Sequence, residues 1–169
     1  PEDIYIKISI TNRSNKPAPV TLLPTLWFYN RWAYTPDEPK PSIKFRDKCS
    51  VLATHNRLDN YYFYFQAAND VLFTENETNF FKFNGTGDEN AFTKDAFHDA
   101  IIKGKNREKL KAKKSGTKFS PVYQMNINGG ETKTIYCRLT TRSDDRPFAL
   151  GFEKIFTVRK QEADDFYSV

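Results

Sequence analysis

The sequence lacks the features that define several large classes of protein. Its 169 residues include two cysteines and one methionine, and no apolar stretch is long enough to cross a membrane as a helix. Cys49 and Cys137 stand far apart and fit no metal-binding or redox spacing, so we expect two buried, reduced thiols rather than a disulfide. Zinc modules, disulfide-stapled scaffolds and membrane-spanning proteins are therefore disfavoured.

The chain is instead rich in aromatic residues, which favour strands. Phe, Trp and Tyr make up 15% of the residues, whereas the strong helix formers Ala, Leu and Met are sparse. A chain of this length fits a single domain that buries roughly 70% of its unfolded surface. The net charge of +5 is a mild and local excess. Composition thus predicts one mainly β domain with a sizeable core.

Alternating hydrophobic patterns predict the strands. In Asp3–Thr11 the isoleucines occupy alternate positions, which is typical of a strand with one buried face. Pro24 interrupts the apolar segment 20–29 and requires an edge position, a bulge or a break there. Further strands are expected at Ser50–Thr54, Tyr61–Gln66, Val71–Thr74, Val122–Ile127 and Thr132–Thr141. The proline-rich segment 31–41 is expected to be a loop.

Two segments show the three-to-four-residue period of an amphipathic helix. One is a short internal helix over residues 94–102, capped by Thr93, with Phe97 on its apolar side. Its polar face comprises Asp95, His98 and Asp99. The other is Gly151–Tyr167 at the C-terminal end, whose apolar stripe needs a surface to pack against.

The most informative feature is a polar cluster set among aromatic residues. It consists of the blocks Thr74-Glu75-Asn76-Glu77-Thr78-Asn79, Lys94-Asp95-Ala96-Phe97-His98-Asp99 and Gly116-Thr117-Lys118. A sheet protein that only had to fold would place such groups singly on solvent faces. Their crowding therefore predicts one organised polar surface.

Each part of the cluster has two interpretations. The amides and carboxylates of the first block either hydrogen-bond sugar hydroxyls or stabilise an irregular loop. A histidine beside two carboxylates allows acid and base chemistry or metal binding, but a lone histidine favours a structural network with Lys94 or Lys118. Trp27 and Trp32 either stack on sugar rings or belong to the core, and the core is favoured for Trp27. We assign no catalytic residue, metal or cofactor.

A run of basic residues extends from Lys103 to Lys118. Its lysines and arginine fall on alternate positions, so an extended segment would present one basic edge suited to nucleic acid or another polyanion. The segment carries no aromatics to stack on bases, and a solvated loop is the favoured interpretation. We therefore expect no nucleic-acid partner and no membrane partner.

Several blocks in the same order resemble one known family. They are Leu23-Pro24-Thr25-Leu26-Trp27-Phe28-Tyr29-Asn30-Arg31-Trp32, the three polar blocks and Glu162-Ala163-Asp164-Asp165-Phe166-Tyr167. The chain resembles the N-terminal part of large bacterial proteins related to glycoside hydrolase family 63, a group of processing α-glucosidases and mannosylglycerate hydrolases. It departs from the family pattern at Tyr29 and Arg31, where Arg and a small polar residue are usual, and at Ala100, where an aromatic is usual.

The resemblance implies an antiparallel β-sandwich of the supersandwich type over residues 1–150. Residues 151–169 would form the helix leading toward an (α/α)6 catalytic domain that this chain does not contain. The absence of an initiator Met and the early strand at Asp3–Thr11 agree with a part of a longer chain. The family's catalytic carboxylates belong to the helical barrel, so this chain alone is not expected to hydrolyse sugars.

The function implied is that of a non-catalytic, cytoplasmic domain that packs on the barrel and lines its sugar site. Its partners would be that domain and the oligosaccharide or glycoside substrate. The candidate residues at the rim of that site are Asn30, Trp32, Asn76, Glu77, Asn79, Asp95, His98 and Lys118. Two alternatives remain open: a freestanding carbohydrate-binding module, and polyanion binding through the basic run.

Overall fold

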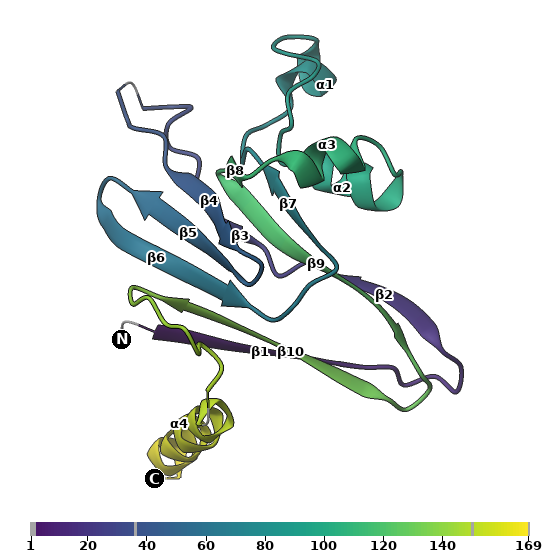
Figure 1. The fold of residues 1–169 in the computed structure, drawn as a ribbon, viewed down its shortest axis with the longest axis vertical. Coiled ribbons are helices and arrows are strands. Elements are labelled where there is room, and N and C mark those ends of the chain that lie inside the picture. The colour runs from purple at the N-terminus through teal and green to yellow at the C-terminus, as the bar shows by residue number, and fades with distance from the viewer. Residues whose placement is uncertain (1–2, 36, 150, 169) are drawn as a thin grey trace.

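A computed structural model describes residues 3–35, 37–149 and 151–168, and the protein is mainly β with antiparallel sheets (Figure 1). The strands are β1 (Asp3–Thr11), β2 (Ala18–Leu22), β3 (Leu26–Trp27), β4 (Ser42–Asp47), β5 (Ser50–His55), β6 (Leu58–Phe65), β7 (Asp70–Thr74), β8 (Ser115–Gly116), β9 (Lys118–Ile127) and β10 (Thr132–Thr140). The helices are α1 (Phe80–Asn84), α2 (Ala96–Ile102), α3 (Arg107–Ala112) and α4 (Phe152–Tyr167). The predicted class, mainly β with a short internal helix and a C-terminal helix, is confirmed.

Two sheets enclose the main core. The 6-stranded sheet has the order β1-β10-β6-β5-β4-β8, and in the 4-stranded sheet β9 pairs with β2, β3 and β7. Phe119 of β9 lies at the centre of the contact, with its ring centroid 6.2 Å from Phe63, 5.4 Å from Phe65 and 4.9 Å from Phe73. Because Phe63 and Phe65 belong to β6, these rings join the two sheets face to face.

The strand predictions at the two ends of the sandwich are confirmed. Strands β5 and β6 pair as an antiparallel hairpin, and β1 covers the predicted segment. The strands predicted at Val122–Ile127 and Thr132–Thr141 are present as β9 and β10, but the hairpin expected between them is wrong, because β9 pairs within the 4-stranded sheet and β10 pairs with β1 and β6. The break expected at Pro24 is present, because β2 ends at Leu22 and β3 begins at Leu26, both paired with β9. Strand β4, which completes the six-stranded sheet, was not predicted.

The basic run is not the solvated loop that the sequence favoured. Residues Arg107–Ala112 form α3, and Leu110 is completely buried in a second core cluster with Leu72 and Val122. The alternating charges concealed a helical period, since Arg107 and Lys111 lie one turn apart and both reach Asp70, at 2.8 and 3.1 Å. A helix of this length is marginal on its own, and burial of Leu110 stabilises it.

Two further side chains depart from their predicted environment. Trp27 was expected in the core, but its side chain is 57% exposed. Ile4 was expected on the buried face of β1 and is 53% exposed. Both residues lie in strands at sheet edges, where a neighbouring strand covers only one side.

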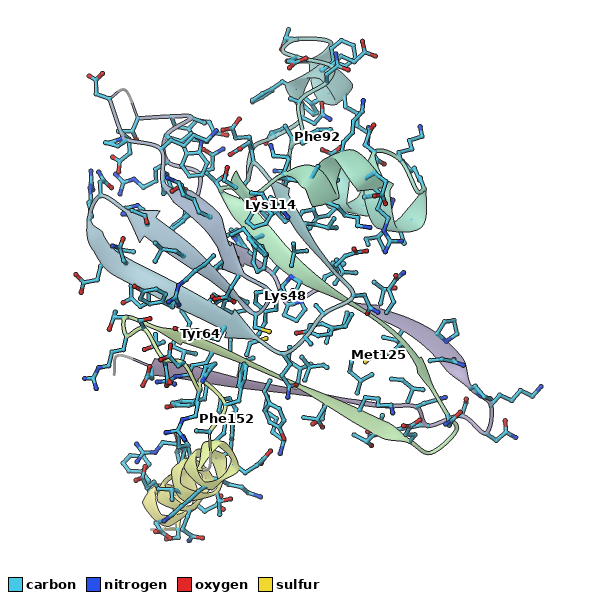
Figure 2. All side chains as sticks on the ribbon, viewed as in Figure 1. Lys48, Tyr64, Phe92, Lys114, Met125 and Phe152 are labelled. Carbon is cyan, nitrogen blue, oxygen red and sulfur yellow. The ribbon has the colours of Figure 1, made fainter. Side chains whose placement is uncertain are left out.

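The C-terminal helix α4 is attached to the sheet through its first turn. Phe152 is buried between Tyr5 and Tyr136, with ring centroids at 4.9 and 5.1 Å. Glu153 accepts hydrogen bonds from Lys7 and Tyr136. Figure 2 shows Phe152 at the base of the helix, where it meets β1 and β10. The predicted domain limits at residues 1, 150 and 169 lie outside the described residues.

The two cysteines are free, as predicted, and differ in accessibility. Cys137 is completely buried in β10, and burial raises the pKa of its thiol to about 12. We expect iodoacetamide to alkylate Cys137 in the folded protein at least about tenfold more slowly than the partly exposed Cys49, because the thiolate is the nucleophile. Peptide mass spectrometry measures both rates, and urea serves as the control that makes them equal. Equal rates in the folded state would contradict this placement.

Candidate functional site

The polar cluster forms one surface at an end of the sandwich. Segment 75–79 follows β7, whose last residue Thr74 pairs with Lys118 at the start of β9. The loop after β3 and the start of α2 complete the surface, and α1 projects beyond it (Figure 1). This polar surface comprises Trp32, Lys40, Glu75, Asn76, Glu77, Asn79, Asp95, Thr117 and Lys118.

Glu77 is the acceptor that ties the loop after β3 to this surface. Trp32 Nε1 donates to Glu77 Oε1 at 2.8 Å, and Lys40 Nζ donates to the same oxygen at 2.7 Å. Lys40 Nζ also lies 3.1 Å from Glu75 Oε2 and 5.9 Å from the centroid of the Trp32 ring. Burial raises the pKa of Glu77, but the hydrogen bonds from Lys40 and Trp32 outweigh it and the net pKa is lowered.

Thr117 and Asn76 connect this pair of carboxylates to the sheets. The buried Thr117 Oγ1 donates to Glu75 Oε2 at 3.0 Å and accepts from the backbone N–H of Asn76 at 2.7 Å. The Asn76 amide donates to the carbonyl of Phe28 at 2.9 Å. The side chain of Asn76 is therefore used to link segment 75–79 to the loop after β3, which agrees with the interpretation that this block stabilises an irregular loop.

Asp95 organises a second network next to the first. It accepts hydrogen bonds from Thr93 Oγ1 at 2.7 Å, Lys82 Nζ at 3.1 Å and Asn79 Nδ2 at 3.4 Å. Asn79 also caps α1, because its Oδ1 accepts from the N–H of Lys82 at 2.9 Å. Burial opposes ionisation of Asp95, but these hydrogen bonds outweigh it and lower its pKa.

Lys118 lies between the two networks, and no carboxylate among the described residues forms an ion pair with it. Its Nζ donates to the carbonyl of Lys94 at 2.8 Å and lies 4.5 Å from the centroid of the Phe97 ring. Half-burial is the main reason that the pKa of Lys118 is lowered. A partly desolvated ammonium over an aromatic ring is stabilised by a cation–π contact. This contact fixes the orientation of the Lys118 side chain.

Asn30 and His98 do not join the networks. The Asn30 Oδ1 accepts from the N–H of Ala33 at 3.2 Å, which stabilises the turn that follows β3. His98 is exposed on α2, and within the described residues its imidazole makes no hydrogen bond or ion pair. The imidazole of His98 is thus free, whereas the carboxylates beside it in sequence are held by lysines, as at Lys103 and Asp99, 2.7 Å apart.

Large aromatic side chains stand exposed around the polar surface. Tyr29 is 81% exposed, Tyr34 is 74% exposed, and Phe83 on α1 is 80% exposed. In the described part of the chain, no group of three or more His, Cys, Asp or Glu side chains could hold a metal ion. The arrangement offers amides, ionised carboxylates and aromatic faces, which suit recognition of a polar ligand with apolar faces better than proton transfer.

Sequence reasoning missed the two lysines that hold the site together, and it did not identify the bonding partners of the two threonines. Lys40, Lys82, Thr93 and Thr117 supply the cations and hydroxyls that fix the carboxylates. Lys40 lies in a loop and Lys82 in the five-residue helix α1, and neither segment carries a periodic signal that would have identified them. Thr93 was singled out as a helix cap, but Asp95 is the residue at the cap position and Thr93 bonds to it instead.

Acidification is expected to weaken the Asp95 network. Because the folded pKa of Asp95 lies below its ordinary value, its stabilisation is fully present above that value and is lost as the pH falls through the folded pKa. The free energy of unfolding should stay flat down to about pH 5 and fall below about pH 4. Urea denaturation of the wild type and of Asp95→Asn across this range measures the effect. The difference in the free energy of unfolding between the two proteins should narrow at low pH, and a constant difference would contradict this role of Asp95.

The helices carry no membrane signal. Within the described residues, none combines the length and the apolar character that a membrane span requires.

Comparison with known proteins finds a distant relative. No family model matches the chain. The chain is similar to the uncharacterized protein YMR196W of Saccharomyces cerevisiae, with 28% identity over a 204-residue alignment that covers 99% of the chain and 19% of the yeast protein. The chain thus spans about a fifth of the length of the curated relative that it matches.

Proposed function

We propose that this chain is the non-catalytic N-terminal β-sandwich, of the supersandwich type, of a larger cytoplasmic protein related to glycoside hydrolase family 63. Its polar surface would line the sugar site of an (α/α)6 domain that continues the same parent chain after α4. The observation that carries the proposal is the combination of fixed, ionised carboxylates with the exposed aromatics Tyr29, Tyr34 and Phe83 around them.

The electrostatics of the polar surface support a role in recognition. Glycoside hydrolysis requires a carboxylic acid that keeps its proton near neutral pH, and therefore a raised pKa. The pKa values of Glu77 and Asp95 are both lowered by the hydrogen bonds from Lys40 and Lys82, respectively, together with Trp32 and Thr93. These two carboxylates are suited to accept hydrogen bonds from hydroxyl groups, and acid catalysis would fall to the partner domain.

Exposed apolar area supports a partner that covers this end of the sandwich. Single exposed hydrophobics are ordinary, but several large aromatics around one polar surface mark an interaction site. Phe80 and Phe81 on α1 are also exposed, at 46% and 39%. The yeast relative is about five times as long as the aligned part, which agrees with a chain that acts within a larger protein.

A freestanding carbohydrate-binding module is the second candidate, and one observation favours it. A cavity of about 280 Å³ opens beside the exposed Trp27 and is lined by Phe28, His55 and Tyr61 among other residues. An indole face next to an imidazole could take a single sugar ring. The polyanion alternative has less support, because Arg107, Lys111 and Lys103 are paired with acidic side chains.

Calorimetric titration of the chain separates the first two candidates. We expect no heat with gluco- or manno-oligosaccharides at millimolar concentration, because half of the proposed site belongs to the partner domain. Trp27→Ala is the matched control. Binding by the wild type that disappears in Trp27→Ala would establish the module and remove the first proposal.

A further inference from the structure

The cleft between α4 and the six-stranded sheet has no role in the proposed function. It has a volume of about 920 Å³ and lies between α4, β1 and β10 (Figure 1). Its apolar lining includes Ile4, Ile155 and Val158. Only the first turn of α4 is packed, so most of the helix borders this cleft or solvent.

The charged lining of the cleft is basic. Arg138 is paired with Asp3 at 3.2 Å and with Asp144 at 2.6 Å, which leaves these three groups with a net charge of about −1. The other lining charges are all positive and comprise Arg146, Lys154 and Arg159, of which Arg159 is paired with Glu162 of the same helix at 2.6 Å. Within the described residues the Lys154 and Arg146 side chains form no ion pair. An apolar segment that carries carboxylates would complement this lining.

The second half of α4 has that composition. Glu162 is paired with Arg159, but Asp164 and Asp165 are further acidic residues, and Phe166 and Tyr167 are 74% and 81% exposed. Acidic groups in the last turn oppose the helix macrodipole, so they weaken an isolated helix. The same acidic groups interact favourably with the first turn of a second, antiparallel helix, because the N-terminal end of the helix dipole and Lys154 both carry positive charge there. The helix is therefore complementary to itself in the antiparallel direction.

The spacing along α4 supports this pairing. Lys154 and Asp165 are eleven residues apart, about three helical turns, and so lie on the same flank of the apolar stripe. In an antiparallel pair related by a twofold axis, Lys154 of one copy faces Asp165 of the other, and the contact occurs twice. Phe166 of each copy then enters the cleft of its neighbour.

We propose that two copies of this chain associate through an antiparallel α4–α4 contact, in which the acidic, aromatic end of each helix occupies the basic, apolar cleft of the other. This inference goes beyond the proposed function and does not depend on it. The alternative is that another domain of the same parent chain packs on the apolar face of α4. In that case the chain alone should be a monomer.

Sedimentation equilibrium of the chain from about 1 to 200 μM tests the proposal. We expect a dimer that weakens with added salt. Lys154→Glu and Asp165→Lys should each raise the dissociation constant about tenfold or more, since each places like charges together twice. An equimolar mixture of the two variants should form a heterodimer within about threefold of the wild-type affinity, because the mixture restores both pairs.

Matched controls make the same charge changes far from α4. Lys105→Glu and Glu89→Lys alter exposed residues in the segments that connect α1, α2 and α3, and these helices lie at the end of the molecule opposite α4 (Figure 1). Both variants should leave the dissociation constant unchanged. A monomer throughout the concentration range would overturn the proposal. A dimer that is insensitive to the α4 variants, or a mixture that does not recover, would overturn it equally.

Discussion

Replacing Phe119 with alanine is expected to lower the free energy of unfolding by about 3 to 5 kcal/mol. Phe119 is completely buried, and its ring contacts Phe63 and Phe65 in the facing sheet and Phe73 in the adjacent strand. Truncation removes the apolar contact that joins the two sheets and leaves a cavity that surrounding strands cannot close. Urea denaturation followed by circular dichroism measures the loss.

The control for this substitution is another phenylalanine. Phe83→Ala removes the same atoms from a side chain that is 80% exposed, so its effect should stay within about 0.5 kcal/mol. Similar losses for the two variants would mean that Phe119 does not hold the sheets together.

Gly116→Ala is expected to cost about 2 to 3 kcal/mol. A Cβ atom at position 116 would lie 2.4 Å from the carbonyl oxygen and 3.0 Å from the carbonyl carbon of Thr74. Both atoms are backbone and belong to the end of β7, so strand β8 must move away. Thr117 would move with it, and the hydrogen bonds of Thr117 to Glu75 and Asn76 would be strained.

Two measurements distinguish this effect from a general loss of stability. Ser115→Ala changes the exposed neighbouring residue and should stay within about 0.5 kcal/mol of the wild type. In a Trp27→Phe background, Trp32 is the remaining tryptophan, and Gly116→Ala should shift its emission to the red as the surface loosens. Unchanged stability would contradict the close approach of β8 to β7.

The fold was predictable where one local pattern matched one environment. The β5–β6 hairpin and the strands β9 and β10 alternate and were found within a few residues, but the pattern did not show that β9 and β10 join different sheets. The break at Pro24 follows from the missing N–H of proline. Helix α3 was missed because its helical character depends on burial of Leu110 against Leu72, a contact distant in sequence. Trp27 was misplaced because the pattern does not reveal which strands form sheet edges.

The candidate site was predictable as a region more than as a set of contacts. Asn76, Glu77, Asn79 and Asp95 converge as expected, because segment 75–79 and the start of α2 meet at the end of β7 and β9. The lysines that stabilise the ionised carboxylates come from the loop before β4 and from the short helix α1, where no spacing rule identifies them. Only geometry shows that Asn76 is occupied by the Phe28 carbonyl.

These contacts divide the proposed rim into two kinds of residue. Asn76 holds the surface together, so Asn76→Ala should destabilise the protein by about 1 to 2 kcal/mol and leave the turnover of an intact enzyme near normal. His98 is exposed, and within the described residues its imidazole makes no hydrogen bond or ion pair, so under the proposed function it remains available to contact a sugar. Substitution there should alter function without altering stability.

The most direct test measures kcat and KM for α-linked gluco- and manno-oligosaccharides in the intact protein that contains this chain. The account predicts that the wild type hydrolyses such a substrate and that His98→Ala lowers kcat/KM about tenfold or more with an unchanged melting temperature. Hydrolysis that is unaffected by His98→Ala, or an intact protein that cleaves no glycoside, would contradict it.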